Sequence, residues 1–221
     1  MEKKFILTDK FIKLASGKKL FQIKCVKSFK YTKEGDLGGY VEKESNLSHK
    51  GDAWVHDDAL VFGDAQVYGN AQVYDNAKVY DDAEVYGDAK LHGNVRVYGY
   101  AEVYDKAQMY GNAQVYDDAK VYGGAQIYGN AQVYGYAEVY GGAQIYGNAQ
   151  VYGDAEVHEE AQIYGYAKVY DTANIHCNTE VYGDANIYGE AWVYGYVSVY
   201  ENAHVYGNAH IYGNVDIYGN A

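Results

Sequence analysis

The sequence predicts an all-β fold: a three-sided parallel β-solenoid with eighteen residues per coil and a β-hairpin cap at its N-terminal end. The first observation is a six-residue frame in which every sixth residue from Val55 to Ile217 is Val, Ile, Leu or Met, without an insertion. The second is that the residue two places earlier is Ala in nearly every unit. Self-similarity at a short fixed period is typical of a solenoid, where each coil buries its apolar face against its neighbours.

Side-chain alternation along a strand separates the inside of each coil from its outside. Ala at i−2 and Val or Ile at i share one face, while residue i−1 shares the other face with residue i+1. Position i−1 holds charged residues such as Lys78, Glu84 and Arg96, which do not line a dry core. We therefore expect Ala and Val to point inward and the residue after each Val or Ile to point outward.

The outward position i+1 carries an aromatic ring or an imidazole throughout the frame. It is Tyr in most units and otherwise Phe62, His56, His92, His158 or His176. Rings repeated at the strand spacing stack in offset fashion, at about 0.5–1 kcal/mol for each pair. We expect two rows of these tyrosines to stabilise the rod and to form a surface for a protein, a glycan or another copy of the chain. The rows are Tyr110, Tyr128, Tyr146, Tyr164, Tyr182 and Tyr200, and Tyr80, Tyr98, Tyr116, Tyr134, Tyr152 and Tyr170.

The size of the core residues predicts three sides per coil. The bulkier inward residues recur at a spacing of eighteen, and so does a row of outward glutamines from Gln108 to Gln162. The bulky residues are Leu91, Met109, Ile127, Ile145 and Ile163. A twelve-residue spacing from Leu91 leads instead to Val103 and Val115, so a two-sided coil does not fit.

Residues 53–221 resemble the hexapeptide-repeat left-handed parallel β-helix, in which an aliphatic residue follows a small one by two. The left-handed coil is what this resemblance implies, because parallel crossover connections are otherwise right-handed. The stretches GGYV from Gly38, NLS from Asn46 and GDAWV from Gly51 resemble the initial segment of YdcK-like bacterial and phage repeat proteins. Members of that group are commonly labelled transferases, a label that rests on the fold.

The first fifty-two residues follow another pattern, so we divide the chain into a cap and initial segment, 1–52, and a solenoid, 53–221. Phe11 to Leu14 and Leu20 to Val26 are predicted as two strands of a hairpin that folds over the first coil. Val41 and Leu47 are six residues apart but out of frame with Val55. The early rungs should therefore join the main register through a slip of two residues near Lys50.

Charge and composition favour a soluble cytoplasmic protein. Residues 1–52 hold 12 Lys and 7 acids, whereas residues 53–221 hold 6 Lys or Arg and 23 acids. The acidic rod should not bind nucleic acid directly, but it could imitate nucleic acid toward a nucleic-acid-binding protein. The chain has no Pro, its Cys25 and Cys177 form no disulfide framework, and it contains no apolar segment able to span a membrane.

Catalytic chemistry is the alternative to a structural or partner-binding role. Hexapeptide acyltransferases use a His as general base beside a cofactor groove, often framed by loops that leave the coil. Here His92, His158 and His176 occupy ring positions, and no loop interrupts the frame after Val55. We therefore expect no catalytic residue and no cofactor. An acyltransferase remains the alternative function.

One cluster has the residue types of a metal site. His158 and His176 are eighteen residues apart and should lie on adjacent coils, with Glu159, Glu160 and Cys177 following at the turn. The ligand candidates are His158, His176, Cys177 and Glu160. Because the position is exposed and a spaced ligand motif is missing, we expect no metal.

The end of the frame predicts self-association. The last coil would present Val205, Ile211 and Ile217 to water beside unpaired backbone groups. We expect two such ends to meet in a tail-to-tail homodimer. The alternative is that a C-terminal cap is missing from this chain.

Overall fold

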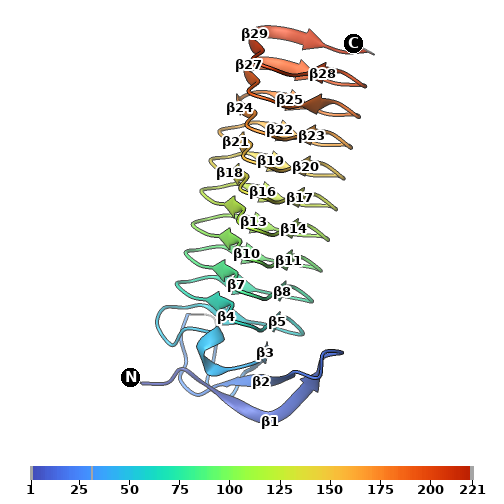
Figure 1. Cartoon of the computed structure of the whole chain (residues 1–221). Coiled ribbons are helices and arrows are strands. Elements are labelled where there is room, and N and C mark those ends of the chain that lie inside the picture. The colour runs from blue at the N-terminus through green and yellow to red at the C-terminus, as the bar shows by residue number, and fades with distance from the viewer. Residues whose placement is uncertain (1, 31, 220–221) are drawn as a thin grey trace.

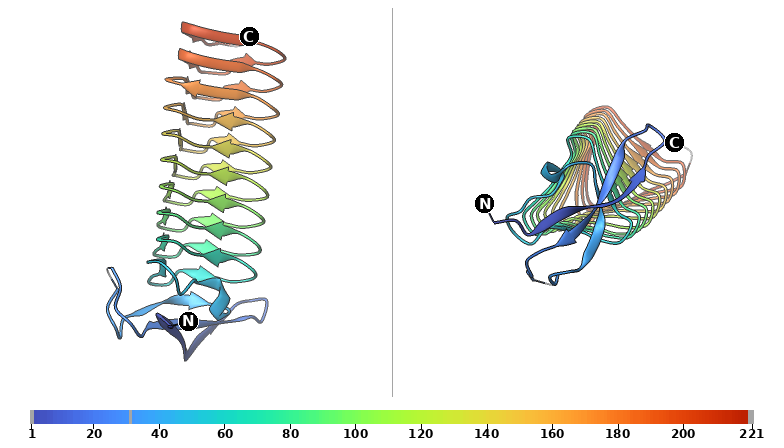
Figure 2. Two further views of the ribbon diagram at one scale, coloured as in Figure 1. Left: turned by 90° about the vertical axis from the view of Figure 1, so that its left-hand side faces the viewer. Right: turned by 90° about the horizontal axis from the view of Figure 1, so that it is seen from below.

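The computed structural model describes residues 2–30 and 32–219, and shows a rod of stacked coils closed at one end by a small antiparallel sheet (Figure 1). About ten turns make up the parallel β-solenoid. The view along the rod shows the N-terminal strands lying across the end of the stack (Figure 2). The predicted all-β fold, with its eighteen-residue coils and its hairpin, is confirmed.

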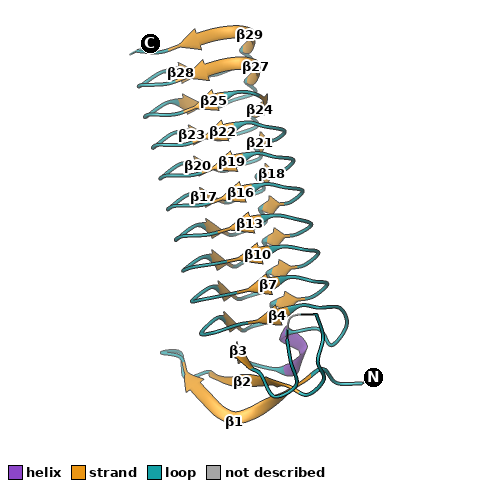
Figure 3. Ribbon diagram, turned by 180° about the vertical axis from the view of Figure 1, so that it is seen from behind, coloured by secondary structure: helices purple, strands orange, loops and turns teal. Residues whose placement is uncertain are grey.

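Three rows of short strands form the sides of the rod, and turns connect them at the corners (Figure 3). Each row is named here after one member. The β11 face holds β3 (Leu37–Val41), β5 (Leu60–Val61), β8 (Lys78–Val79), β11 (Arg96–Val97), β14 (Gln114–Val115), β17 (Gln132–Val133), β20 (Gln150–Val151), β23 (Lys168–Val169), β26 (Asn186–Ile187) and β28 (His204–Val205).

The other two rows are the β10 face and the β12 face. The β10 face holds β4 (Trp54–Val55), β7 (Gln72–Val73), β10 (Lys90–Leu91), β13 (Gln108–Met109), β16 (Gln126–Ile127), β19 (Gln144–Ile145), β22 (Gln162–Ile163) and β25 (Glu180–Val181). The β12 face holds β6 (Gln66–Val67), β9 (Glu84–Val85), β12 (Glu102–Val103), β15 (Lys120–Val121), β18 (Glu138–Val139), β21 (Glu156–Val157) and β24 (Asn174–Cys177). Near the end of the rod, β27 (Trp192–Val199) and β29 (His210–Ile217) run from the β12 face around the corner to the β10 face.

Strand pairing establishes the eighteen-residue coil. Leu91 pairs in parallel with Val73 of the preceding coil and with Met109 of the following one. Met109 pairs with Ile127 in the same way, so the bulky core residues form one continuous row on the β10 face. The Ala and Val positions are fully buried along the rod, as at Ala137 and Val139. The inward assignment is therefore correct.

The corners are tight because the second residue after each core Val or Ile adopts a left-handed backbone conformation. This residue is usually Gly or Asp, as at Gly129 with φ +70° and Asp117 with φ +59°. A Cβ atom on Gly129 would lie 3.0 Å from the backbone N and O atoms of Gly147 in the next coil. The stacked corners thus favour glycine both for its conformation and for its small size.

The cap is a three-stranded antiparallel sheet made of β1 (Phe5–Lys13), β2 (Lys19–Cys25) and β3. The predicted hairpin is present, but its first strand begins at Phe5 rather than at Phe11. The earlier start was missed because an irregularity in the pairing between Leu7 and Phe11 interrupts the alternation. The buried Lys4 donates hydrogen bonds from Nζ to the carbonyl oxygens of Ala53 (2.7 Å) and Gly51 (3.3 Å), and burial lowers its pKa to about 8. These contacts fasten the cap to the first coil.

The predicted slip of two residues is present where the cap joins the rod. Val41 pairs with Val61 and Leu47 bridges to Val67, at spacings of twenty residues, whereas Val55 pairs with Val73 at the regular eighteen. A short 3-10 helix, η1 (Glu44–Asn46), lies between these two early rungs. The buried Asn46 donates hydrogen bonds from Nδ2 to the carbonyl oxygens of Ala65 (2.8 Å) and Gly63 (3.1 Å). The change of register therefore keeps its backbone contacts.

At the far end, β29 pairs with β27 along its whole length. Ile211 and Ile217 are half-buried there, and Val215 is 38% exposed. Val205 is only 5% exposed, because Ile211 and Ile217 of the same coil pack against the core cluster that contains it. The end surface is therefore made by Ile211 and Ile217, and the expectation that Val205 faces water is wrong.

Candidate functional site

The outward rings form stacked ladders on all three faces of the rod. On the β10 face, Tyr146 stacks on Tyr128 at 4.7 Å between ring centroids and on Tyr164 at 4.8 Å, with ring planes within 4° of parallel. The β11 face carries a similar ladder from Phe62 to Tyr206, which includes the predicted row from Tyr80 to Tyr170. The predicted stacking is thus present, with ring spacing set by the distance between neighbouring strands.

The ladder rings also make hydrogen bonds that the sequence analysis missed. The hydroxyl of Tyr68 donates to Oε2 of Glu84 (2.6 Å), and that of Tyr110 donates to Oε1 of Gln126 (2.9 Å). In each case the acceptor lies sixteen residues later, at the outward strand position of the next coil. The feature of the sequence that could have predicted these hydrogen bonds is a Gln or Glu that recurs sixteen residues after a ladder tyrosine. Bonds of this kind link neighbouring coils at several places on the β10 and β12 faces, and Tyr116 donates one to Oε1 of Gln132 on the β11 face (3.3 Å).

Away from the C-terminal end of the rod, the tyrosines of the ladders are half-buried rather than projecting, whereas the last ladder rings, Tyr206, Tyr212 and Tyr218, are 60–63% exposed. Burial raises the pKa of Tyr116 to about 12. Burial and the hydrogen bond to Glu138 together raise the pKa of Tyr122. Elsewhere along the rod, the tyrosines that project occupy corners, as at Tyr100, Tyr136 and Tyr166, which are 63–66% exposed. On the β10 face, from Tyr110 to Tyr164, the row therefore exposes ring edges whose hydroxyls are bonded to amide or carboxylate groups, whereas on the β11 face, among the described residues, only Tyr116 of the predicted row donates such a bond, to Oε1 of Gln132 (3.3 Å).

Two histidines replace tyrosines at consecutive positions of the β12-face ladder. His158 stacks on Tyr140 at 4.7 Å and on His176 at 4.9 Å. The next residue at the corner, Glu159, directs Oε2 toward Nδ1 of His176 (3.8 Å) and accepts a hydrogen bond from the backbone N–H of Cys177 (3.0 Å). Sγ of Cys177 lies 3.3 Å from Nδ1 of His176. We call these four residues the His158 corner.

The electrostatics of the His158 corner follow from burial and close contacts. Burial and the neighbouring His158 lower the pKa of His176, so its imidazole is mainly neutral. Cys177 and Glu159 contact each other. This contact raises the pKa of the Cys177 thiol and lowers the pKa of the Glu159 carboxyl. The predicted ligand Glu160 lies outside the cluster, because its carboxylate approaches Gly142 of the preceding coil. Glu159 therefore takes the place that the sequence analysis gave to Glu160.

A family model that describes the YdcK beta solenoid repeat matches residues 125–141 and 143–159. This match and the stacked coils of the structure fit a YdcK-like beta-solenoid repeat protein. The two matched segments lie in consecutive coils, and the second ends inside the His158 corner. A search of curated proteins found no matching relative. The six-residue frame of the chain extends beyond the matched segments, from Val55 to Ile217.

His92 is the third histidine considered as a general base, and it occupies a ring position of the six-residue frame on the β10 face. It stacks on Tyr74 at 4.4 Å, and its Nδ1 lies 3.9 Å from Oδ2 of Asp75. A second stack on that face begins at Tyr110 with Tyr128. The structure does not bring His92 together with His158 or His176, which lie on another face.

Asparagines form a further ladder that the sequence analysis missed, at the corner between the β10 and β11 faces. Nδ2 of Asn94 donates to Oδ1 of Asn112 (3.2 Å), and the same bond links Asn112 to Asn130 (3.0 Å) and Asn130 to Asn148 (3.2 Å). The feature of the sequence that could have predicted this ladder is an Asn residue repeated every eighteen positions. This corner as well as the faces is thus cross-linked from coil to coil.

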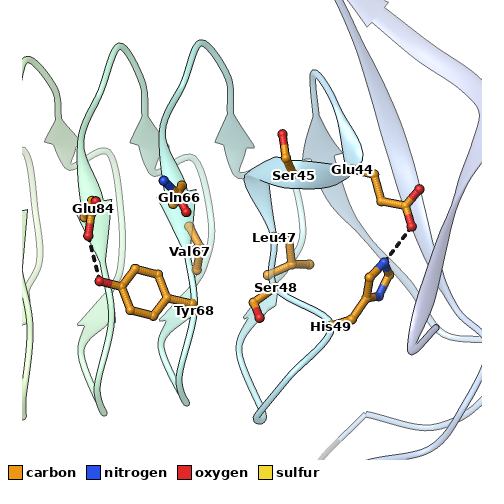
Figure 4. A pocket seen from close by; sticks show the side chains of 9 residues that line it. All are labelled: Glu44, Ser45, Leu47, Ser48, His49, Gln66, Val67, Tyr68 and Glu84. Carbon is orange, nitrogen blue, oxygen red and sulfur yellow. Dashed lines mark hydrogen bonds and ion pairs between the residues drawn. The ribbon is translucent and has the colours of Figure 1, made fainter. Parts of the chain in front are cut away.

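A cavity lies where the cap joins the solenoid (Figure 4). It is lined by Glu44, Ser45, Leu47, Ser48, His49, Gln66, Val67, Tyr68 and Glu84. Nε2 of His49 contacts Oε1 of Glu44 (2.6 Å), Nδ1 accepts a hydrogen bond from the backbone N–H of Lys4 (3.3 Å), and the ring stacks on Phe5. Both ring nitrogens are thus engaged by the cap, which gives His49 a structural role.

Among the described residues, no helix has the length and apolar character needed to cross a membrane.

Proposed function

We propose that the protein is a non-enzymatic rigid scaffold, in which the ring ladders stiffen the rod and present a continuous surface to a partner. The observation that carries the proposal is the coil-to-coil linkage on the faces. Rings stack at intervals near 4.8 Å, and hydroxyls such as that of Tyr146 bond to the next coil, here at Oε1 of Gln162 (3.3 Å). Stacked side-chain ladders favour a straight, untwisted sheet, so they suit a rod that holds contacts at fixed intervals.

The placement of the histidines supports a non-enzymatic role. A general base must reach a proton on a bound substrate, so it requires a groove that holds that substrate beside it. His92, His158 and His176 instead stack within ladders, and His158 also contacts Oδ1 of Asn174 through Nε2 (3.2 Å). These contacts use the imidazoles as flat rings.

The partner that best fits this surface is a protein with a basic face. Acidic side chains gather at the corner between the β11 and β12 faces, and Glu84, Glu102, Glu138 and Glu156 follow on the adjacent β12 face. The corner residues are Asp64, Asp81, Asp82, Asp117, Asp118, Asp154, Asp171 and Glu190. This one-sided acidity favours a second candidate function, the imitation of nucleic acid toward a nucleic-acid-binding protein. Binding by that mechanism should weaken steeply as salt is raised.

Self-association at the β29 end is part of the proposal for the 221-residue chain. The far edge of β29 and the half-buried Ile211 and Ile217 are suited to a second copy related by a two-fold axis. The end of one coil is small compared with the roughly 1,000 Å² expected of a stable interface. Lateral contacts between ring ladders should therefore contribute to the dimer.

Calorimetry with coenzyme A tests the non-enzymatic role directly. The scaffold proposal predicts no saturable heat of binding when coenzyme A or acetyl-coenzyme A is titrated into the protein. Saturable binding that is lost in His92→Tyr or His176→Tyr would overturn it and support the acyltransferase. These variants place the usual repeat residue at the ring position, so they should keep the fold.

A further inference from the structure

We propose that the His158 corner binds one divalent transition metal ion of the zinc class through His158, Glu159 and His176, with Cys177 as the fourth ligand. Ligand atoms of the first three residues all lie within 4.8 Å of one another. Imidazole, carboxylate and thiolate together form a donor set typical of zinc. The proposal goes beyond the scaffold function, because the rest of the ladders would not be needed for it.

Several residues of the His158 corner differ from the residues that the repeat usually has at their positions. In the described ladders, His158 and His176 are the one pair of histidines that stack directly on each other, since Tyr74 separates His56 from His92. At the left-handed corner position of the described solenoid residues, every unit has Gly or Asp except for Glu159, Cys177 and Glu201. Four residues with ligand side chains thus replace two rings and two turn residues at one place.

Two of the proposed ligands hold the left-handed backbone conformation of the corner position. Glu159 has φ +57° and Cys177 has φ +61°, in a conformation that glycine adopts most easily. Both residues project their side chains from the same corner in consecutive coils. Left-handed residues with ordinary side chains often occur where a site requires their direction.

The distances are close to those of a tetrahedral site. Zinc bonds of about 2.0–2.3 Å to nitrogen, oxygen and sulfur put neighbouring ligand atoms about 3.3–3.8 Å apart. Nδ1 of His176 already lies 3.3 Å from Sγ of Cys177 and 3.8 Å from Oε2 of Glu159. The two imidazoles, stacked at 4.9 Å, would tilt toward each other to share the ion. Coordination by sulfur would release the thiol proton of Cys177 to solvent.

A second group of contacts orients His158 as a ligand. Nδ2 of Asn174 donates a hydrogen bond to Oε2 of Glu156 (3.0 Å), which leaves Oδ1 of Asn174 to accept one from Nε2 of His158 (3.2 Å). This arrangement places the proton of His158 on Nε2 and the lone pair on Nδ1. Such an outer hydrogen bond to a metal-binding histidine fixes the ring and its tautomer. Asn174 is therefore a positioning residue of the proposed site.

The test is titration of the chelator-treated 221-residue chain with Zn²⁺ by calorimetry and with Co²⁺ by absorption spectroscopy. The proposal predicts one ion per chain and a tetrahedral Co²⁺ spectrum with a thiolate charge-transfer band. The double variant His158→Tyr/His176→Tyr should lower Zn²⁺ affinity by more than about tenfold, and Glu159→Gly should also weaken it. These changes put the usual repeat residues in place, so circular dichroism should remain that of the folded rod.

His92→Tyr is the matched control, because it makes the same change on another face. It should leave Zn²⁺ affinity unchanged, whereas Cys177→Ser should remove the charge-transfer band. Equal Zn²⁺ affinity for the wild type and the double variant would overturn the proposed site. A Co²⁺ spectrum of the wild type without the thiolate band would overturn the assignment of Cys177 as a ligand.

Discussion

The hydroxyl of Tyr86 donates a 2.7 Å hydrogen bond to Oε2 of Glu102, which lies sixteen residues later in the next coil. The ring of Tyr86 also stacks on Tyr68 and Tyr104, at 4.7 Å and 4.8 Å. One side chain therefore links its own coil to both neighbours. Repeated along the faces, this arrangement adds side-chain ladders to the backbone hydrogen bonds of the rod.

The hydroxyl bond makes a separable contribution to stability. Tyr86→Phe keeps the stacked ring but removes the donor to Glu102, so the free energy of unfolding should fall by about 0.5–1.5 kcal/mol. Tyr134→Phe is the control, because the Tyr134 hydroxyl makes no hydrogen bond to any side chain in the described part of the chain. Chemical denaturation of both variants is the measurement. Equal losses for the two would contradict a stabilising role for the sixteen-residue hydrogen bond.

Interior volume should be strictly limited. Ala137 is fully buried between coils, so Ala137→Leu should overpack the core and cost at least about 1–3 kcal/mol of unfolding free energy. Gln144 faces outward and accepts the hydroxyl of Tyr128, as a carboxylate also can, so Gln144→Glu should cost little. Denaturant midpoints compare the two. If they coincide, the separation of inside from outside is wrong.

The ladder tyrosines predict a loss of stability at alkaline pH. Burial raises the folded-state pKa of Tyr116 to about 12, above its unfolded value near 10. The folded rod then keeps a proton that the unfolded chain releases, so this stabilisation is complete below about pH 10 and is lost as pH rises toward 12. Ultraviolet titration of tyrosinate in native and urea-unfolded protein is the measurement. Native ladder tyrosines that titrate together with the unfolded chain would contradict the prediction.

The proposed dimer depends on the apolar end surface. Sedimentation of the 221-residue chain should show a dimer, and Ile211→Lys with Ile217→Lys should convert it to a monomer, because two charged end surfaces repel each other. Gln150→Lys is a control that adds a cation to the outer surface of the β11 face beside Lys168. A monomeric wild type at tens of micromolar would refute end-to-end pairing.

The sequence was sufficient for the repeat but not for side chains whose partners depend on the three-dimensional stacking. The six-residue frame predicted the buried rows and the ring ladders, because alternation alone assigns them to faces. The bond from Tyr86 to Glu102 requires knowing that a ring reaches sideways to the strand of the next coil. The sequence analysis chose Glu160 rather than Glu159 as a ligand. The left-handed backbone at the corner directs Glu159 toward His176, and this conformation is a property of the turn that residue spacing does not reveal.

Removal of ladder rings with a composition-matched control tests the scaffold most directly. Changing Tyr128, Tyr146 and Tyr164 to Ser removes a run of stacked rings, and thermal unfolding should reveal a loss of about 2–4 kcal/mol from about four contacts. Changing the exposed corner residues Tyr100, Tyr136 and Tyr166 to Ser removes the same number of tyrosines without breaking a ladder, and should leave stability nearly unchanged. Equal stability of the two triple variants would contradict the claim that the ladders hold the rod rigid.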